Sequence, residues 1–321
     1  MTTMSQTKVQ GNMRVPQPVQ FKRLIPPLAT DSNLKPKTTQ TAPMRDPTQS
    51  STRGLRLHLG MFEIGKPLGK GKFGRVYLAK HRSSGFICAL KVLNKDEIRR
   101  DKAETHVRRE IEVHGNIRHP GVVGFYGWFH DSRRIFLILE YAPGGELYKP
   151  LRRESRFSER RAAKYAAQVA NALIYLHNKN IMHRDIKPEN ILIGLHGELK
   201  LADFGYSAHA PSNFRETLCG TLDYLPPEML SSGPVKYTKA VDQWTLGVLT
   251  YEFLAGEAPF EDVGVMTQRR ILKCDMKPLP TWLSSEAKNF VQSLLVLDPT
   301  KRLSLEGVLA HPWIVKNCDQ K

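Results

Sequence analysis

The sequence HRDIKPEN occupies residues 183–190, and the tripeptide DFG follows at residues 203–205. The first stretch brings an aspartate, a lysine and an asparagine close together along the chain, and the second adds another aspartate. Taken singly, each of these residues is most often found in a turn or on the surface. The ordered string is not expected by chance, so these residues point to a common chemical task.

Four of these residues match the needs of phosphoryl transfer. That reaction requires a base that orients the attacking hydroxyl, oxygen ligands for Mg²⁺, and positive charge near the γ-phosphate. Asp185 can serve as the base, Asn190 and Asp203 as metal ligands, and Lys187 as the positive charge. The sequence therefore predicts transfer of the γ-phosphoryl group of Mg·ATP.

A glycine-rich stretch lies further toward the N-terminus. Residues 69–76, GKGKFGRV, fit the pattern G-x-G-x-x-G-x-V. Glycines let the backbone close over phosphates and present its N–H groups to them. A dinucleotide-binding turn shares the three glycines but opens a helix, whereas RVYLAK, which follows Gly74, is typical of a strand. An ordinary hairpin turn is the alternative interpretation.

Two charged residues are predicted to pair in the interior. Lys91 lies in CALKVL, a strand with apolar neighbours, where a lysine is costly to bury without an anion. Glu110 lies on a predicted helix at 102–117 and shares a face with Val107 and His114. Such a pair would hold the ammonium toward the α- and β-phosphates. The alternatives are a strand-edge lysine that reaches water and a solvent-exposed glutamate.

Composition excludes several classes of protein. The chain has 321 residues, 40% of them hydrophobic, and a formal net charge of +17. No apolar run approaches the roughly 20 residues of a membrane span. The start of the sequence lacks the apolar segment that a secretory signal would have. The four cysteines are far apart, which argues against a zinc site or a disulfide framework and fits a reducing cytosol or nucleus. The charge favours an acidic partner such as nucleic acid, a membrane surface or nucleotide phosphates.

The chain divides into segments of different character. Residues 1–60 hold nine basic and two acidic residues and seven prolines, so residues 1–59 are predicted to form a disordered basic tail. Strand patterns dominate the next 80 residues, and helical patterns begin near residues 158, 239, 283 and 304. The prediction is an α+β protein with these parts: a β-rich N-lobe with one key helix at 60–140, a hinge at 140–145, a larger helical C-lobe at 146–314 and a short tail at 315–321.

In their order, G-x-G-x-x-G-x-V, A-x-K, H-R-D-x-x-x-x-N and D-F-G make residues 60–314 resemble a eukaryotic protein kinase. The resemblance implies a bilobal kinase fold, the cofactors ATP and Mg²⁺, and a monomeric catalytic domain. PPE at 226–228 stands where kinases carry A-P-E, and Arg302 is expected to pair with Glu228. Lys187 is placed as in serine/threonine kinases.

The same resemblance implies a nucleotide site with Leu139 as gatekeeper. The backbone groups of Glu140 and Ala142 would face the adenine. The residues expected around ATP are Leu68, Gly69, Lys70, Gly71, Lys72, Phe73, Gly74, Val76, Ala89, Lys91, Leu139, Glu140, Ala142, Glu189, Asn190 and Asp203.

A narrower resemblance follows from longer strings. DFGYSAHAPSNFRETLCGTLDYLPPEM at 203–229 and EYAPGGELY at 140–148 make the chain resemble the Aurora kinases, closest to their fungal and B-type members. This implies that Thr217 is the activation-loop phosphosite. The arginines implied to bind its phosphate are Arg184, Arg109 and Arg215.

The segment before Thr217 departs from the family pattern. Auroras usually carry two basic residues at the third and second positions before the phosphorylated threonine, where this chain has Phe214 and Arg215. Glu216 comes next and can partly supply negative charge. The self-recognition motif is thereby weakened, so autophosphorylation at Thr217 is left open.

Three carboxylates are expected to select the substrate. Glu146, Glu189 and Glu252 match positions at which basophilic kinases bind arginines before the target residue. Carboxylates beside the peptide would select Arg or Lys through charge-assisted hydrogen bonds. The alternative is that each glutamate is structural or faces solvent.

The Aurora resemblance implies work in mitotic chromosome segregation, at the kinetochore, centromere and spindle in the nucleus, and in the cytoplasm otherwise. It also implies an inner-centromere-protein-type activator on the small lobe, together with chromosomal passenger subunits. Two alternatives stay open: a divergent basophilic kinase with a different cell-cycle role, and a chromatin-binding pseudokinase scaffold. The basic run at 152–164 can contact anionic partners or be a solvated helix face.

Overall fold

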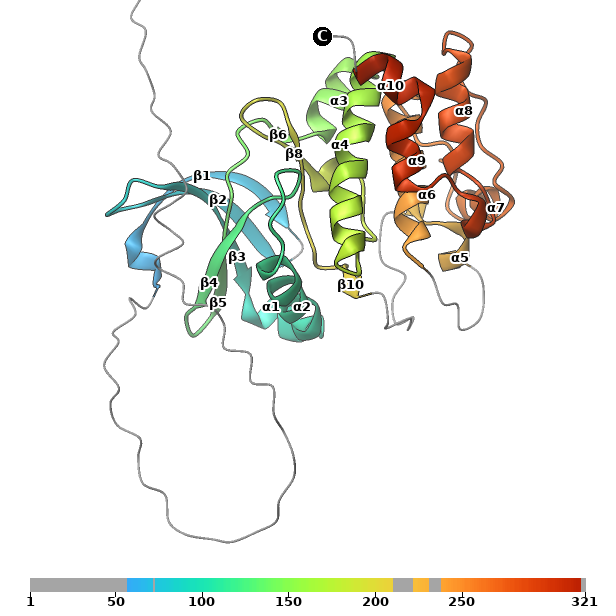
Figure 1. The fold of residues 1–321 in the computed structure, drawn as a ribbon. Coiled ribbons are helices and arrows are strands. Elements are labelled where there is room, and N and C mark those ends of the chain that lie inside the picture. The colour runs from blue at the N-terminus through green and yellow to red at the C-terminus, as the bar shows by residue number, and fades with distance from the viewer. Residues whose placement is uncertain (1–56, 72, 210–221, 231–237, 319–321) are drawn as a thin grey trace, which may run out of the picture.

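The computed structural model describes residues 57–71, 73–209, 222–230 and 238–318. Figure 1 shows two lobes, a sheet with two short helices on one side and a mostly helical part on the other. This confirms the predicted α+β class and its bilobal arrangement. Most of the predicted N-terminal tail lies outside the described residues.

The small lobe is built on an antiparallel sheet with strand order β1-β2-β3-β5-β4. Its strands are β1 (Phe62–Gly71), β2 (Gly74–His81), β3 (Ile87–Asn94), β4 (Phe125–His130) and β5 (Arg134–Leu139). Successive residues of a strand point to opposite faces, so Leu137 packs on one face while Phe136 and Ile138 pack on the other.

Two helices cover one face of this sheet. They are α1 (Lys95–Arg100) and α2 (Glu104–Gly115). Ile98 of α1 and Val107 of α2 pack with Leu93, Phe125 and Leu137 of the sheet. The opposite face is covered by residues around the 3-10 helix η2 (Leu59–Met61). Helix α2 is thereby fixed beside β3, where it carries Glu110 toward Lys91.

The large lobe surrounds α4 (Glu159–Asn178) and α6 (Ala240–Ala255). Ser158 caps α4 by accepting a hydrogen bond from the Arg161 N–H, as N-cap serines do. Residues buried along α4 include Ala166, Val169 and Leu173, which recur at helical spacing. The remaining helices of this lobe are α3 (Tyr148–Glu154), α5 (Pro227–Leu230), α7 (Val265–Lys273), α8 (Ser285–Leu294), α9 (Leu305–Ala310) and α10 (Pro312–Cys318).

Short strands line the junction between the lobes. Strands β6 (Gly145–Glu146), β8 (Ile191–Ile193) and β9 (Leu199–Leu201) form one small sheet, and β7 (Ile181–Met182) pairs with β10 (Ala208–His209). The segments between these strands contain HRDIKPEN and DFG. The fold therefore delivers both motifs to the same edge of the large lobe.

Partly buried polar contacts join the elements of the large lobe. Arg302 makes two hydrogen bonds to Glu228, each 2.7 Å long, which confirms the pair expected from the sequence. Glu159 accepts hydrogen bonds from the Ser284 backbone and hydroxyl and from the Trp313 indole, so α4 is joined to α8 and α10. In the described part of the chain, no helix is both long and apolar enough to cross a membrane.

Candidate active site

The HRDIKPEN stretch connects β7 to β8 and ends in the 3-10 helix η3 (Pro188–Asn190). Asp185 is buried there, and Lys187 Nζ lies 3.1 Å from Asp185 Oδ1. The side-chain amide of Asn190 donates to both the backbone carbonyl and Oδ2 of Asp185, at 2.9 and 2.6 Å. Three residues that the sequence assigned to phosphoryl transfer thus meet around one carboxylate.

Asp203 follows β9 and faces the small lobe. Its Oδ1 lies 3.9 Å from Lys91 Nζ, and Lys91 Nζ lies 2.6 Å from Glu110 Oε1. Burial alone would lower the pKa of Lys91, but the carboxylates of Asp203 and Glu110 outweigh it and raise that pKa. The Lys91 ammonium in turn lowers the pKa of Asp203. Burial raises the pKa of Glu110, although the Lys91 ammonium opposes this. Lys91 stays protonated and Asp203 ionised, so the site keeps one fixed cation beside the Asp203 carboxylate.

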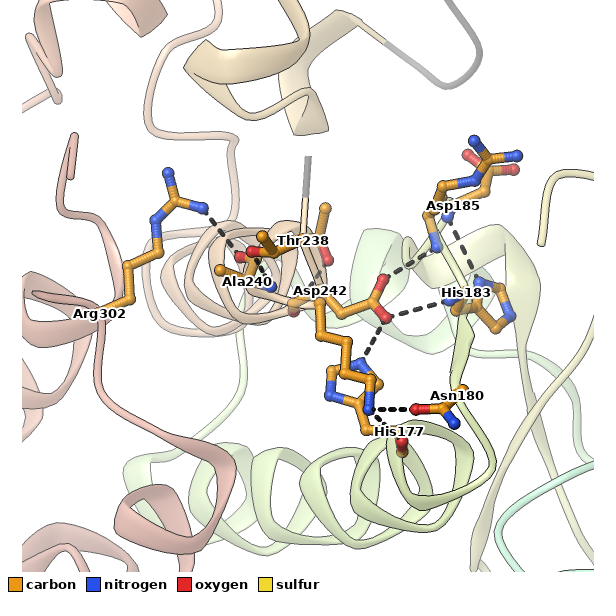
Figure 2. A network of polar contacts seen from close by, with 11 residues as sticks. His177, Asn180, His183, Asp185, Thr238, Ala240, Asp242 and Arg302 are labelled. Carbon is orange, nitrogen blue, oxygen red and sulfur yellow. Dashed lines mark hydrogen bonds and ion pairs between the residues drawn. The ribbon is translucent and has the colours of Figure 1, made fainter. Parts of the chain in front are cut away.

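The carboxylate of Asp242, on α6, contacts the backbone at the start of the HRDIKPEN stretch (Figure 2). Its carboxylate accepts hydrogen bonds from the His177 ring (2.8 Å), the His183 N–H (3.0 Å) and the Arg184 N–H (2.9 Å). Burial alone would raise the pKa of Asp242, but these donors lower it, so the buried carboxylate stays charged.

Two residues of the site have left-handed backbone angles. Arg184 has a φ of 69° and Asp203 a φ of 63°. Non-glycine residues adopt this region at a cost of about 1–3 kcal/mol each and keep it only where surrounding contacts enforce it. At Arg184 that contact is the hydrogen bond from its N–H to Asp242.

The glycine-rich stretch forms the β1–β2 hairpin above the site, with Gly71 paired to Gly74. A Cβ at Gly74 would lie 1.8 Å from the Val92 carbonyl oxygen, so the close approach to β3 requires glycine there. A cavity of about 250 Å³ lies between this hairpin, α2 and Asp203. Lys72 lies outside the described residues.

The expected adenine contacts lie at the end of β5 and just beyond it. Leu139 ends β5 and pairs with Ala89 of β3, and Ala142 is buried. The Glu140 N–H donates to the Gly124 carbonyl at 2.8 Å. Of the remaining residues expected around ATP, Leu68 and Gly69 are half-buried in β1, Lys70 is exposed, and Phe73 and Val76 are half-buried in or near β2.

The proposed phosphate-binding group is described only in part. Arg184 Nε donates to the Tyr206 carbonyl at 2.6 Å, which keeps its guanidinium beside the DFG segment. Arg109 is half-buried on α2, next to Glu110. Thr217 and Arg215 lie outside the described residues.

The three candidate selecting glutamates differ in setting. Glu189 is exposed and Glu146 is half-buried. The carboxylate of Glu146 lies 3.6 Å from where a Cβ of Gly69 would sit, so it borders the glycine-rich hairpin. Glu252 of α6 is 9% exposed and accepts a hydrogen bond from the Tyr224 hydroxyl, and burial raises its pKa. Glu252 therefore has a structural partner that the sequence did not suggest.

His114 is a buried residue of the site region to which the sequence assigned no role. Its ring lies 4.6 Å from the Phe204 ring centroid and 5.3 Å from that of Phe125. Its Nε2 donates to the Val123 carbonyl at 2.6 Å, and no described residue hydrogen-bonds to its Nδ1. Burial lowers the pKa of His114 to about 4, so the ring is neutral at neutral pH. The histidine therefore links α2 to Phe204 of the DFG motif.

We expect His114 to make the fold sensitive to acid. The ring pKa is about 4 in the folded protein and about 6.5 in the unfolded chain. The unfolded chain thus binds more protons between these values, so stability is complete above pH 6.5 and is lost as pH falls toward 4. Between pH 7 and 5 this residue should account for a loss of about 2 kcal/mol in the free energy of unfolding.

Urea unfolding at pH 7 and 5 tests this expectation. A His114→Gln variant keeps a donor for Val123 but cannot titrate, so its stability should fall by about 2 kcal/mol less than wild type over that range. Equal losses in both proteins would show that His114 does not carry the acid sensitivity.

The residues present fit a nucleotide-bound magnesium ion. Mg²⁺ prefers oxygen ligands and is usually held by one or two carboxylates together with substrate phosphates. The side chain of Asp203 is 43% exposed. Asn190 directs its amide nitrogen to Asp185, and its amide oxygen is a second possible ligand. No cluster of three or more metal-binding side chains occurs in the residues that the structure describes.

The comparisons with known proteins agree with this geometry. A family model described as "Protein kinase domain" matches residues 62–314, so the chain is a protein kinase. An "Aurora kinase" of Schizosaccharomyces pombe is 58% identical over 275 residues, which cover 85% of this chain and 77% of that protein. "Aurora kinase A-B" of Xenopus laevis is 55% identical over 260 residues, which cover 81% of this chain and 63% of that protein. "Serine/threonine-protein kinase Aurora-1" of Arabidopsis thaliana is 52% identical over 82% of this chain and 90% of that protein.

The chain therefore belongs to the Aurora family of serine/threonine protein kinases. Its predicted enzyme class is confirmed. Protein kinases transfer the γ-phosphoryl group of ATP with the help of Mg²⁺.

Proposed function

We propose that this kinase phosphorylates Ser and Thr hydroxyls in Arg-containing sequences, with the roles that the sequence assigned to its site residues. The observation that carries the proposal is the meeting of two groups at the lobe junction. One is the Lys91–Glu110 ion pair beside Asp203, and the other is Asp185 with Lys187 and Asn190. This is the full set of groups that phosphoryl transfer needs.

Each side chain has a task that its position supports. Lys91, braced by Glu110, binds the α- and β-phosphates, and the hairpin at Gly69–Val76 covers them. Asp203 and Asn190 would hold Mg²⁺, which supplies charge neutralisation on the phosphates. Asp185 orients the substrate hydroxyl and receives its proton, and Lys187 offsets the charge that develops on the transferred group. With all these groups in place, a pseudokinase is the weaker alternative.

Arginine selection is proposed for Glu146 and Glu189 first. Both carboxylates reach solvent near the site, and Glu146 borders the glycine-rich hairpin. Glu252 is close enough to Glu189 for their charges to interact, which contributes to its raised pKa after the larger effect of burial. We propose that Glu252 acts with Glu189 while it also anchors Tyr224.

A peptide array with [γ-³²P]ATP tests this selection. Wild type should prefer peptides with Arg before the acceptor, and Glu146→Gln or Glu189→Gln should each lower that preference about tenfold, because a charge-assisted hydrogen bond is lost. Glu306→Gln, an exposed change on α9, is the control. Indifference of the wild type to Arg would defeat the proposal.

An activator on the small lobe is also proposed. A groove of about 590 Å³ lies between α1, α2 and the sheet, and it includes Trp128, Ile111 and Ile135. Trp128 is 44% exposed there, which suits the docking of an apolar segment. We propose that an inner-centromere-protein-type activator, with chromosomal passenger subunits, docks on this lobe. Adding the activator fragment to the array should raise activity, and no response would contradict the docking.

The cellular role is proposed from the family. Work in mitotic chromosome segregation would place the chain at the kinetochore, centromere and spindle in the nucleus, close to chromatin, and in the cytoplasm otherwise. We propose that residues 60–314 form the kinase domain, and that the basic segment 1–59 directs the protein to chromosomes. Imaging a tagged chain with and without residues 1–59 tests that part, and unchanged placement on chromosomes would dispose of it.

A further inference from the structure

Lys200, in the middle of β9, lies where three segments of the chain meet. Its ammonium is 2.9 Å from Glu140 Oε1 and donates to the Pro120 carbonyl at 3.0 Å. Glu198 Oε1 lies further away, at 3.7 Å. The Lys200 side chain is only 9% exposed. Burying a lysine this far is costly unless its charge is paired, so the contact to Glu140 is a specific feature of the fold.

The second carboxylate oxygen of Glu140 is also engaged. Glu140 Oε2 accepts a hydrogen bond from the Gly124 N–H at 2.9 Å, while the Glu140 N–H donates to the Gly124 carbonyl at 2.8 Å. A Cβ at Gly124 would lie 3.4 Å from that carboxylate oxygen, so the side chain of Glu140 fills the space beside this glycine. The backbone at the start of the hinge is therefore fixed both by its own amide and through its side chain.

The loop that receives Glu140 is itself bound to the large lobe. The Arg118 N–H donates to the Tyr175 hydroxyl of α4 at 2.8 Å, and the His119 ring stacks on Tyr175 at 4.9 Å. The Leu201 N–H donates to the Gly121 carbonyl, and the Leu201 carbonyl accepts from the Val123 N–H, both at 2.9 Å. The partners of Glu140 thus belong to a body that includes β9 and α4.

Along the chain, Lys200 connects the elements that hold Glu140, namely β9 and α4 with the loop at 118–124, to the proposed catalytic residues. It precedes Asp203, the proposed magnesium ligand, by three residues, and Ala202 between them donates its N–H to the Asn190 carbonyl at 2.8 Å. The ion pair therefore joins the hinge, where adenine would bind, to the strand that leads to the edge that would hold the phosphates and the metal.

We propose that the Lys200–Glu140 ion pair positions the hinge backbone for the adenine of ATP, so that Lys200 is a positioning residue for nucleotide binding. The inference rests on the proposed placement of ATP at Glu140 and Ala142. Without the ammonium, the Glu140 carboxylate loses its charged partner, and the hinge is held to β9 less firmly, through the contacts of Gly124 and its neighbours alone. The adenine contacts then have to be formed at an entropic cost, which weakens ground-state binding more than the chemical step.

Nucleotide titration of the full chain tests the proposal. The Kd of Mg·AMP-PNP from calorimetry and the KM for ATP should each rise about fivefold in Lys200→Met, while kcat at saturating ATP stays within about twofold. If Lys200 had a purely structural role, Lys200→Met would lower kcat and stability, and the Kd and KM would not rise selectively. Glu140→Asp keeps the charge but shortens the side chain, and it should show the same split in a protein that retains its fold.

A double-mutant cycle makes the test specific to the pair. Lys200→Met combined with Glu140→Gln should be no worse than the weaker-binding single variant, because both changes break one interaction. Lys316→Met, the same chemical change at an exposed ion pair with Glu286, is the control and should leave Kd unchanged.

The outcomes separate this inference from the proposed function. A wild type that neither binds Mg·AMP-PNP nor phosphorylates peptide would overturn the proposed function. A wild type that does both, with variants that bind equally well, would overturn the positioning role alone. Variant effects that multiply in the cycle, or a lower KM in Lys200→Met, would overturn it too.

Discussion

Asp185→Asn should lower kcat about 10³-fold, which is the usual range for loss of a positioned general base. Asn has nearly the same shape as Asp but cannot receive the proton of the substrate hydroxyl. The buried carboxylate of Asp185 is contacted by Lys187 and Asn190, which hold it in position. Steady-state transfer from [γ-³²P]ATP to an Arg-containing peptide measures the loss.

The Kd of Mg·AMP-PNP should change by less than about twofold in the same variant, because the base contacts the reacting hydroxyl and not the nucleotide. Asp275→Asn is the matched control, since Asp275 has a side chain that is 66% exposed and pairs only with Arg270 among described ion pairs. A variant at position 185 with more than a tenth of the wild-type kcat would remove Asp185 from its proposed role.

Asp242→Asn should destabilise the large lobe and reduce catalysis together. The carboxylate is fully buried and accepts three hydrogen bonds, so an amide in its place leaves at least one buried donor unpaired. We expect a loss of about 3 kcal/mol, which for a domain of this size lowers Tm by about 6–12 °C. The freed backbone at Arg184 should also move Asp185, with a fall in kcat of about 10²-fold.

Thermal unfolding followed by circular dichroism, with kcat measured well below Tm, checks both effects. The control is again Asp275→Asn, which should leave Tm within about 1 °C because the Asp275 side chain is exposed. If Asp242→Asn kept its Tm and lost only activity, the network in Figure 2 would not contribute to the stability of the protein.

Strong periodicity made most of the fold predictable. Helix α4 was expected because its apolar residues recur at helical spacing, and β3 was expected from a run of apolar and β-branched residues. Helix α1 was missed because KDEIRR buries only Ile98. The available signal was its cap, since the Asn94 side chain accepts from the Asp96 N–H.

The site was predictable where its groups lie in ordered motifs, and less so where contacts join distant segments. Asp185, Asn190 and Asp203 stand in motifs, so their types and spacing indicated the chemistry. Glu140 and Lys200 are 60 residues apart in unrelated segments, and neither neighbourhood indicates the other. His114 was placed on the inner face of α2, but only the structure shows its tilted ring contact with Phe204.

The position of Asp242 has a consequence for how such a chain can diverge. One carboxylate lies in the interior of the large lobe and also binds the HRDIKPEN loop, so we expect a substitution there to reduce activity and stability together. Lys91 and Asp185 are different, because the roles proposed for them lie in the transfer reaction and neither side chain joins α4 to α6. A duplicate gene could therefore lose catalysis by substitution of Lys91 or Asp185 and still encode a folded protein that binds partners. Loss of Asp242 would impair both catalysis and the folded scaffold.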